Sequence, residues 1–555
     1  MTAAGADPRS PTVHGPDRAS APLNAGERRQ LGRLRRWGTV GALLMMVGST
    51  SSYGAANPNP NPLDGSRIVG LLSRIGPAAL ACSYSGIGLL VLCWFLIGRL
   101  AVPGRTRRLS RTQLTHTLAM WAVPLLVTPP IFSRDVYSYL AVGSMMVQGD
   151  NPYQSGPYDA LGDDNPFAHQ VDARWQHTTT PYGPAFLLVA KAVAAIAGHH
   201  VTTGVLLQRF VELIGVAAIV WALPRLARRC GIDPVGALWL GALNPLVLFH
   251  LVAGGHNEAL MIGAMLVGLV VAVGHSEPDR AEHRIFRLAP WLRPVLGGAC
   301  LAFAIGVKAT AGLGLVFLVI LLARRAGGRW SDLWRYAAVV GGAALLTFGA
   351  LTLAAGFGLG WVSALGTPGT VRSFLSISTT LGVGAGWLGM LLGLGEHTQA
   401  AVDVMQPVGT IAGGLVAAWI AWRCWRPWRG RTVMDPLLGL GLAFGAFVLL
   451  GPVIQPWYLL WAAIPLAAAT GWSRYRRVTV WLTTIFSVII MPNGGTILPF
   501  TIVVCVLVAA VVVATVLFWL HRTGLPPRTA GDPSPIPAGE PTSEPEGSTT
   551  YRRDS

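Results

Sequence analysis

The hydrophobic residues of this chain lie in long continuous runs, separated by shorter polar segments. Runs of about 15 to 23 apolar residues are long enough to cross the hydrocarbon core of a bilayer as helices. The pattern therefore predicts an all-α, polytopic helical membrane protein with about 14 transmembrane helices. The predicted spans are 38–56, 78–100, 115–132, 204–224, 236–252, 258–274, 294–308, 310–323, 335–356, 401–425, 435–451, 456–471, 477–491 and 499–520.

One polar segment, 133–183, is much longer than the others and follows the third predicted span. The short apolar run 184–198 comes after it. If that run crossed the membrane, every later arginine cluster would face outward, against the tendency of Lys and Arg to stay cytoplasmic. We therefore interpret 184–198 as a helix lying in the membrane interface. Residues 133–203 then form an extracytoplasmic loop that carries interfacial helices, and both chain ends lie inside.

Composition supports a membrane protein and argues against nucleic acid as a partner. The chain has 555 residues, 52% of them hydrophobic and only 12% charged, about half the charged fraction of a soluble domain. Its net charge of +17 indicates cytoplasmic arginine clusters. Residues 1–34 and 521–555 have the composition of disordered tails, which we expect in the cytoplasm. One domain, 35–520, holds the predicted spans, and the first of these is expected to be a span rather than a signal peptide.

The long loop begins with an Arg-Asp pair and two tyrosines, directly after an apolar span. A carboxylate in that place is partly shielded from water, which raises its pKa and suits a general base. Asp135 could instead cap a helix over 136–149, and the two roles can coexist. The rest of the loop is acidic and aromatic, and it is too long for a simple connector.

Four short motifs carry a resemblance to known proteins. They are Ser133-Arg134-Asp135-Val136-Tyr137-Ser138-Tyr139, Thr180-Pro181-Tyr182-Gly183-Pro184, Gly255-His256-Asn257-Glu258 and Gln455-Pro456-Trp457-Tyr458. Their order resembles the GT-C superfamily of glycosyltransferases, which use polyprenyl-phosphate sugars. More narrowly, it is similar to the actinobacterial polyprenol-phosphomannose-dependent α-1,6-mannosyltransferases, over roughly residues 35–520.

The resemblance implies a GT-C-like fold and a multi-pass enzyme of the cytoplasmic membrane. Its donor would be polyprenyl-phosphate-mannose, and its acceptor a phosphatidylinositol-mannoside or lipomannan, extended with inversion on the outer face. We expect no cofactor, and we expect no obligatory metal because the sequence contains no Asp-X-Asp motif. A polyprenyl phosphate leaves without protonation, so no second carboxylate is needed as a general acid. The residues alone do not select the sugar, so an arabinosyl or glucosyl transferase is the main alternative. A secondary transporter would need repeats and mid-span charges, and a non-catalytic scaffold is a third class.

The expected catalytic residue is Asp135. Lys308, Arg372 and Arg134 are expected to bind the donor phosphate or lipid. Lys308 could instead anchor at the outer headgroups, Arg372 could be an ordinary loop arginine, and Arg134 could pair with Asp135. The residues expected to bind substrate are Tyr137, Tyr139, Asp164, His256, Glu258, Gln455, Trp457 and Tyr458.

Several of these residues also have a purely structural explanation. Asn257 and Glu258 could cap a helix, and Asp164 lies in a segment typical of an Asx turn. Trp457 and Tyr458 lie where an aromatic belt is expected. His256 has no such explanation.

Overall fold

The computed structural model describes residues 21–101, 107–274, 289–370, 373, 375–427, 432–471, 473–489, 491–495 and 497–524. Its secondary structure is helical, apart from a two-residue parallel pairing of β1 (Ala21–Pro22) with β2 (Arg107–Arg108). The expected all-α class is confirmed. The outermost parts of both predicted tails, 1–20 and 525–555, lie outside the described residues.

Nineteen helices are named here; most lie in the predicted spans, one of which contains a π-helix, η3, whereas α4, α5, α6 and α13 lie outside them. They are α1 (Ala25–Gly48), α2 (Gly76–Gly98), α3 (Arg111–Leu126), α4 (Asp135–Gln148), α5 (Pro157–Leu161), α6 (Pro184–Ala197), α7 (Val201–Arg229), α8 (Pro234–Gly241), η3 (Val247–Ala253), α9 (Glu258–Val273), α10 (Leu292–Val307), α11 (Gly312–Ala326), α12 (Trp330–Ala355), α13 (Ile377–Leu391), α14 (Thr398–Trp425), α15 (Pro436–Leu450), α16 (Leu459–Ala469), α17 (Arg474–Val488) and α18 (Pro499–Arg522).

Two boundaries differ from the sequence prediction. The expected N-terminal tail, 1–34, overlaps α1, because the Asn24 side chain accepts a hydrogen bond from the Glu27 N–H at 2.8 Å and starts the helix there. Helix α13 was not predicted, since its glycine, serine and threonine residues dilute the apolar pattern.

Within the described ranges, six helices are long and apolar enough to cross a membrane, or seven if η3 and α9, which are bent by 107°, form one broken span. These helices make the protein a multi-pass membrane protein. The fourteen spans stay a prediction, because many of the other apolar helices are shorter than a full crossing.

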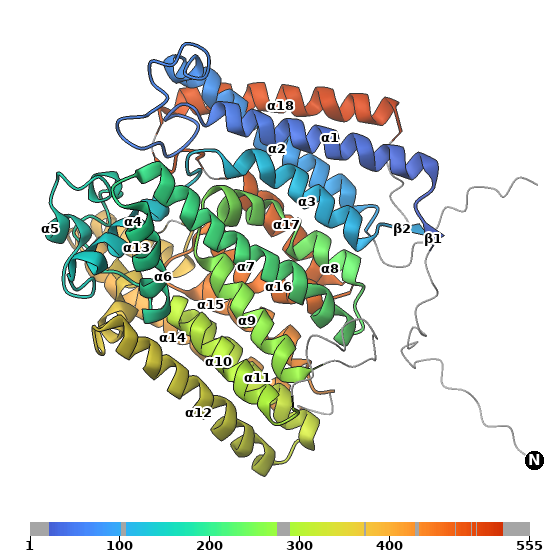
Figure 1. The fold of residues 1–555 in the computed structure, drawn as a ribbon, viewed down its shortest axis with the longest axis vertical. Helices are drawn as coiled ribbons and strands as arrows, with labels where there is room; N and C mark the ends of the chain where they lie inside the picture. The colour runs from blue at the N-terminus through green and yellow to red at the C-terminus, as the bar shows by residue number, and fades with distance from the viewer. Residues whose placement is uncertain are drawn as a thin grey trace, which may run out of the picture.

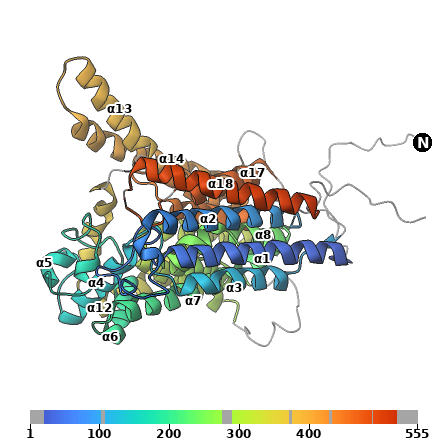
Figure 2. The ribbon, with the colours of Figure 1, turned by 90° about the horizontal axis from the view of Figure 1, so that it is seen from above.

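The long helices run side by side, and α4, α5 and α6 gather at one end of the bundle (Figure 1). Helix α13 and the start of α14 stand away from the bundle (Figure 2). At the end of the bundle where α7 finishes, arginine side chains form hydrogen bonds with backbone carbonyls of neighbouring helices and of the segments beside them. Arg324 donates to the carbonyls of Cys424 and Met434, and Arg476 to that of Gly236. Helix α7 has 29 residues, a length of roughly 43 Å at about 1.5 Å per residue, so the two ends lie a membrane thickness apart.

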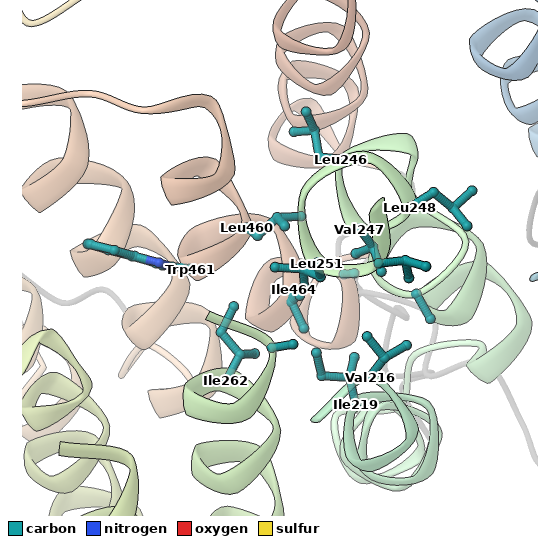
Figure 3. Packing of buried hydrophobic residues seen from close by; sticks show 14 of the residues in the cluster. Val216, Ile219, Leu246, Val247, Leu248, Leu251, Ile262, Leu460, Trp461 and Ile464 are labelled. Atoms are coloured by element: carbon teal, nitrogen blue, oxygen red, sulfur yellow. The ribbon is translucent and has the colours of Figure 1, made fainter. Parts of the chain in front are cut away.

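The centre of the bundle is packed around η3. Leucine and valine side chains of η3 lie against α7, α9 and α16 (Figure 3). Helices α7 and α9 touch through glycines: a Cβ on Gly215 would lie 2.3 Å from the Ala259 carbonyl oxygen. This close approach fixes the short segment between η3 and α9, which carries His256, and the start of α9, where Glu258 is the first residue.

Candidate active site

A cavity of about 1260 Å³ opens beside the start of α4. Its polar wall comes from α4, the long loop and the segments around residues 308 and 455. Its apolar wall comes from α11, α14, α15 and the segment before α13. That apolar wall reaches the surface, where the side chains of Leu365, Ile411 and Ile489 are more than half exposed. The cavity can therefore hold a molecule with a polar head and a long apolar tail.

Asp135 is the first residue of α4 and lines the cavity, with 22% of its side chain exposed. Phe132, three residues before Asp135, has φ +75°, a strained backbone conformation for a residue other than glycine. It is held by a 2.6 Å hydrogen bond from its N–H to the Pro492 carbonyl. The predicted helix after Asp135 is confirmed, but the alternative in which Asp135 caps it is wrong, because Arg134 occupies the N-cap position.

Burial raises the pKa of the Asp135 carboxyl above its usual range. The hydrogen bond with Ser133 and the positive charges of Lys308 and Arg174 oppose that shift without cancelling it. A carboxylate with a raised pKa, open to a cavity, has the properties of a general base.

Lys308 lies between α10 and α11 and lines the same cavity. Its Nζ is 2.5 Å from Glu258 Oε1 and lies over three aromatic rings, with centroids at 4.7 Å (Tyr458), 5.3 Å (Trp461) and 5.9 Å (Tyr182). The ion pair and the rings hold the ammonium in place. The headgroup-anchor alternative is therefore wrong, because the amine points into the protein, with 16% of the side chain exposed.

Gln455, Trp457 and Tyr458 line the cavity, as a substrate-binding role requires. Five other residues expected to bind substrate do not line it in the described part of the structure. They are Tyr137, Tyr139, Asp164, His256 and Glu258.

The reasons differ from residue to residue. The Tyr137 hydroxyl donates to the Ala56 carbonyl at 2.7 Å, and Tyr139 packs edge-on against Tyr182 and Phe186. Asp164 is exposed beside Asn165, whose side chain accepts from the N–H groups of the two residues after Pro166 and so forms the alternative Asx turn.

His256 and Glu258 are fully buried behind the cavity wall. Glu258 holds Lys308, and His256 stacks on Trp457 with the ring centroids 3.9 Å apart. Asn257 occupies the N-cap position of α9, as the helix-capping alternative expected, but its side chain makes no capping hydrogen bond. That alternative is therefore confirmed for the position of Asn257 and not for a capping contact.

Arg134 also lies outside the cavity wall. Its guanidinium donates to the Asn57 carbonyl at 3.0 Å and to the Gln170 carbonyl at 3.0 Å. It therefore ties the long loop to the segment after α1. Arg372, the third expected phosphate ligand, lies outside the described residues.

The sequence prediction missed two groups of cavity residues. Arg174 lines the cavity and forms a bidentate pair with Asp172, at 2.8 and 3.1 Å. Asp403, Gln406 and Thr410 of α14 line the opposite wall. These three recur at helical spacing in an otherwise apolar helix, a signal that could have revealed them.

No group of three or more His, Cys, Asp or Glu side chains that could hold a metal ion is found among the described residues. The expectation that the protein needs no metal stays a prediction.

Comparison with known proteins agrees with the motifs. Residues 35–324 match the family model described as "Alpha-(1->6)-mannopyranosyltransferase, N-terminal domain", and residues 378–519 match "MptB C-terminal domain". The chain is 40% identical to a "Probable alpha-(1->6)-mannopyranosyltransferase" of Mycolicibacterium smegmatis, over 95% of each chain. It is 38% identical to an "Alpha-(1->6)-mannopyranosyltransferase" of Mycobacterium tuberculosis, over 96% of this chain and 95% of the relative.

A third relative is "Alpha-(1->6)-mannopyranosyltransferase B" of Corynebacterium glutamicum, 34% identical over 87% of this chain and 80% of its own length. The two matched regions contain Asp135, Lys308, Trp457 and Tyr458. The chain is a mannosyltransferase, and it belongs to the alpha-(1->6)-mannopyranosyltransferase family.

Proposed function

We propose that the protein transfers mannose from polyprenyl-phosphate-mannose to the primary hydroxyl of an α-1,6-mannan acceptor, such as a phosphatidylinositol-mannoside or lipomannan. The observation that carries this proposal is the lining of one cavity. The partly buried carboxylate of Asp135 and the ammonium of Lys308, held in place by its ion pair, both line this cavity, and its apolar wall reaches the surface. The apolar wall suits the polyprenyl chain, and the ammonium suits its phosphate.

The reaction forms one bond and breaks another. The acceptor oxygen attacks the anomeric carbon from the face opposite the phosphate, so the configuration inverts as the carbon–phosphate-oxygen bond breaks. Asp135 takes the hydroxyl proton, and the polyprenyl phosphate leaves as an anion beside Lys308. No general acid is needed, in contrast to the two-carboxylate glycosidases.

We place this reaction on the extracytoplasmic face of the cytoplasmic membrane. The arginines that tie helix ends together lie at the end of the bundle where α7 finishes, whereas the cavity opens beside α4, near where α7 begins. Arginine-rich ends are typically cytoplasmic. Cysteine labelling of 150–170 from outside intact cells tests this orientation, and labelling of residues 327–329 instead would reverse it.

The acid limb of the pH–activity profile should report Asp135. A general base must be ionised, so transfer should fall as the pH drops through its pKa. Because burial raises that pKa, the fall should occur above pH 3.9, the approximate value of an unperturbed Asp. The measurement is kcat/KM for the donor across the pH range at constant ionic strength. A rate that stays flat down to about pH 4 would contradict this assignment.

Arg174 and Arg134 form a matched pair for testing donor binding. Replacing Arg174 by Gln removes a cation from the cavity and should raise the donor KM. We expect a rise of only about tenfold, because this arginine is partly exposed and solvent screens its attraction for a phosphate. Replacing Arg134 by Gln should lower the melting temperature instead, because its backbone contacts are lost. If Arg134→Gln raised the donor KM and Arg174→Gln lowered only the melting temperature, the phosphate would lie near Arg134 instead.

The direct test of the proposed function uses the protein in lipid nanodiscs with labelled polyprenyl-phosphate sugars and synthetic α-1,6-dimannoside. Transfer of mannose, with inverted anomeric configuration by NMR, is the expected result. Transfer of arabinose or glucose but not mannose from the matching donors would overturn the donor assignment.

A further inference from the structure

We propose that His256 is a positioning residue that orients the Asp135 carboxylate, rather than a ligand of either sugar. The proposal rests on the proposed role of Asp135 as the base. Its structural basis is a chain of contacts behind the cavity wall: Asp135 against His256, and His256 against Trp457.

His256 is fully buried and forms no part of the cavity wall. A sugar bound in the cavity meets Trp457 and Asp135 first, and the imidazole lies behind them. The substrate-binding role expected from the sequence is therefore not available to this ring.

The Nδ1 atom of His256 is 3.5 Å from Asp135 Oδ2. Neither ring nitrogen of His256 has a hydrogen-bond partner within the described ranges. A buried polar group without a partner is costly, and the Asp135 carboxylate is an acceptor close to Nδ1. Hydrogen bonds of catalytic groups are often long before substrate binds and tighten in the complex.

The backbone keeps His256 from moving away. The segment between η3 and α9 turns by 107°, with Gly255 at φ +67°, a conformation that favours glycine. The His256 N–H donates to the His250 carbonyl at 3.1 Å, and Trp457 covers one face of the imidazole. These contacts hold the ring in the place where Nδ1 is the nitrogen near Asp135.

Two substitutions separate the two ring nitrogens. The side-chain nitrogen of Asn lies near the place of Nδ1, whereas that of Gln lies near the place of Nε2. His256→Asn should therefore keep most of the turnover, and His256→Gln should lower kcat about 10- to 100-fold with the donor KM unchanged, because a base displaced by even about 1 Å loses efficiency.

The pH profile gives a readout that packing alone would not move. A hydrogen bond donated to a carboxylate favours its ionised form, so losing it should shift the acid limb of kcat, which reports the enzyme–substrate complex, upward by roughly 0.5 to 1 pH unit in His256→Gln. The variant leaves unaltered the other groups that act on the Asp135 charge, which are Ser133, Lys308, Arg174, Asp172, Tyr139, Tyr182 and Tyr458.

His250 supplies the matched control. It is equally buried, its ring lies 5.1 Å from that of Trp457, and it packs against Phe132 rather than Asp135. His250→Asn should leave the acid limb in place, whatever it does to stability.

Three outcomes decide the proposal. An upward shift in His256→Gln, absent from His256→Asn and His250→Asn, supports it, as does the loss of any His256 effect in an Asp135→Asn background. Equal loss in both His256 variants with an unmoved acid limb overturns it and leaves a packing role. Full activity of Asp135→Asn would instead remove the proposed base itself, a failure that is distinguishable from the other two.

Discussion

Asp135→Asn should fold, insert into the membrane and bind donor, yet transfer mannose at least about 100-fold more slowly. Asn keeps the size of the side chain and can keep the contact with Ser133, but it cannot accept the hydroxyl proton. The helix should not suffer, because Asp135 does not cap α4. Single-turnover transfer from labelled donor, with the melting temperature as the stability control, measures the effect.

Asp403→Asn is the matched control, because it removes a second carboxylate from the wall of the same cavity. It should change acceptor KM more than turnover. A fully active Asp135→Asn variant would remove Asp135 as the base, and an Asp403→Asn variant with the larger loss of turnover would move the base to α14.

Lys308→Met should lower transfer by about 100-fold or more, because the ammonium stabilises the charge that develops on the leaving phosphate. It should also destabilise the protein by roughly 3–5 kcal/mol, since Glu258 would be left buried without its partner. The two effects need to be separated.

The double variant Lys308→Met with Glu258→Gln separates them. Removing both charges should restore much of the thermal stability, while transfer stays low and the donor KM stays high. If the double variant recovered transfer together with stability, Lys308 would be a structural residue and the phosphate would be held elsewhere, for example by Arg174.

Local features of the site could be predicted from the sequence, and long-range pairings could not. Asp135 and Lys308 stand out because each is an isolated charge next to apolar sequence. The partner of Lys308 lies 50 positions away, and it depends on the 107° bend after η3, whose direction the glycines at 254 and 255 do not reveal.

Tyr137 and Tyr139 illustrate a second limit. Their place beside Asp135 in one motif suggested a shared function, but both are core residues of α4, 0% and 1% exposed. Arg174 illustrates a third, because it lies in a loop whose many polar residues follow no period. The loop fold alone brings it to the cavity.

The division of the active site between two parts of the chain has a consequence for biogenesis. Asp135, Glu258 and Lys308 belong to the matched region 35–324, whereas Tyr458 and Trp461 belong to 378–519. Synthesis at about 5–20 residues per second therefore exposes Lys308 for several seconds or more before two of its three aromatic rings, those of Tyr458 and Trp461, exist, whereas the Tyr182 ring is made earlier. Glu258, made earlier, is already present to neutralise it. A nascent chain stopped at 324 would thus carry a charge-balanced half-site, while a chain that begins at 378 would carry aromatic rings without a cation to surround.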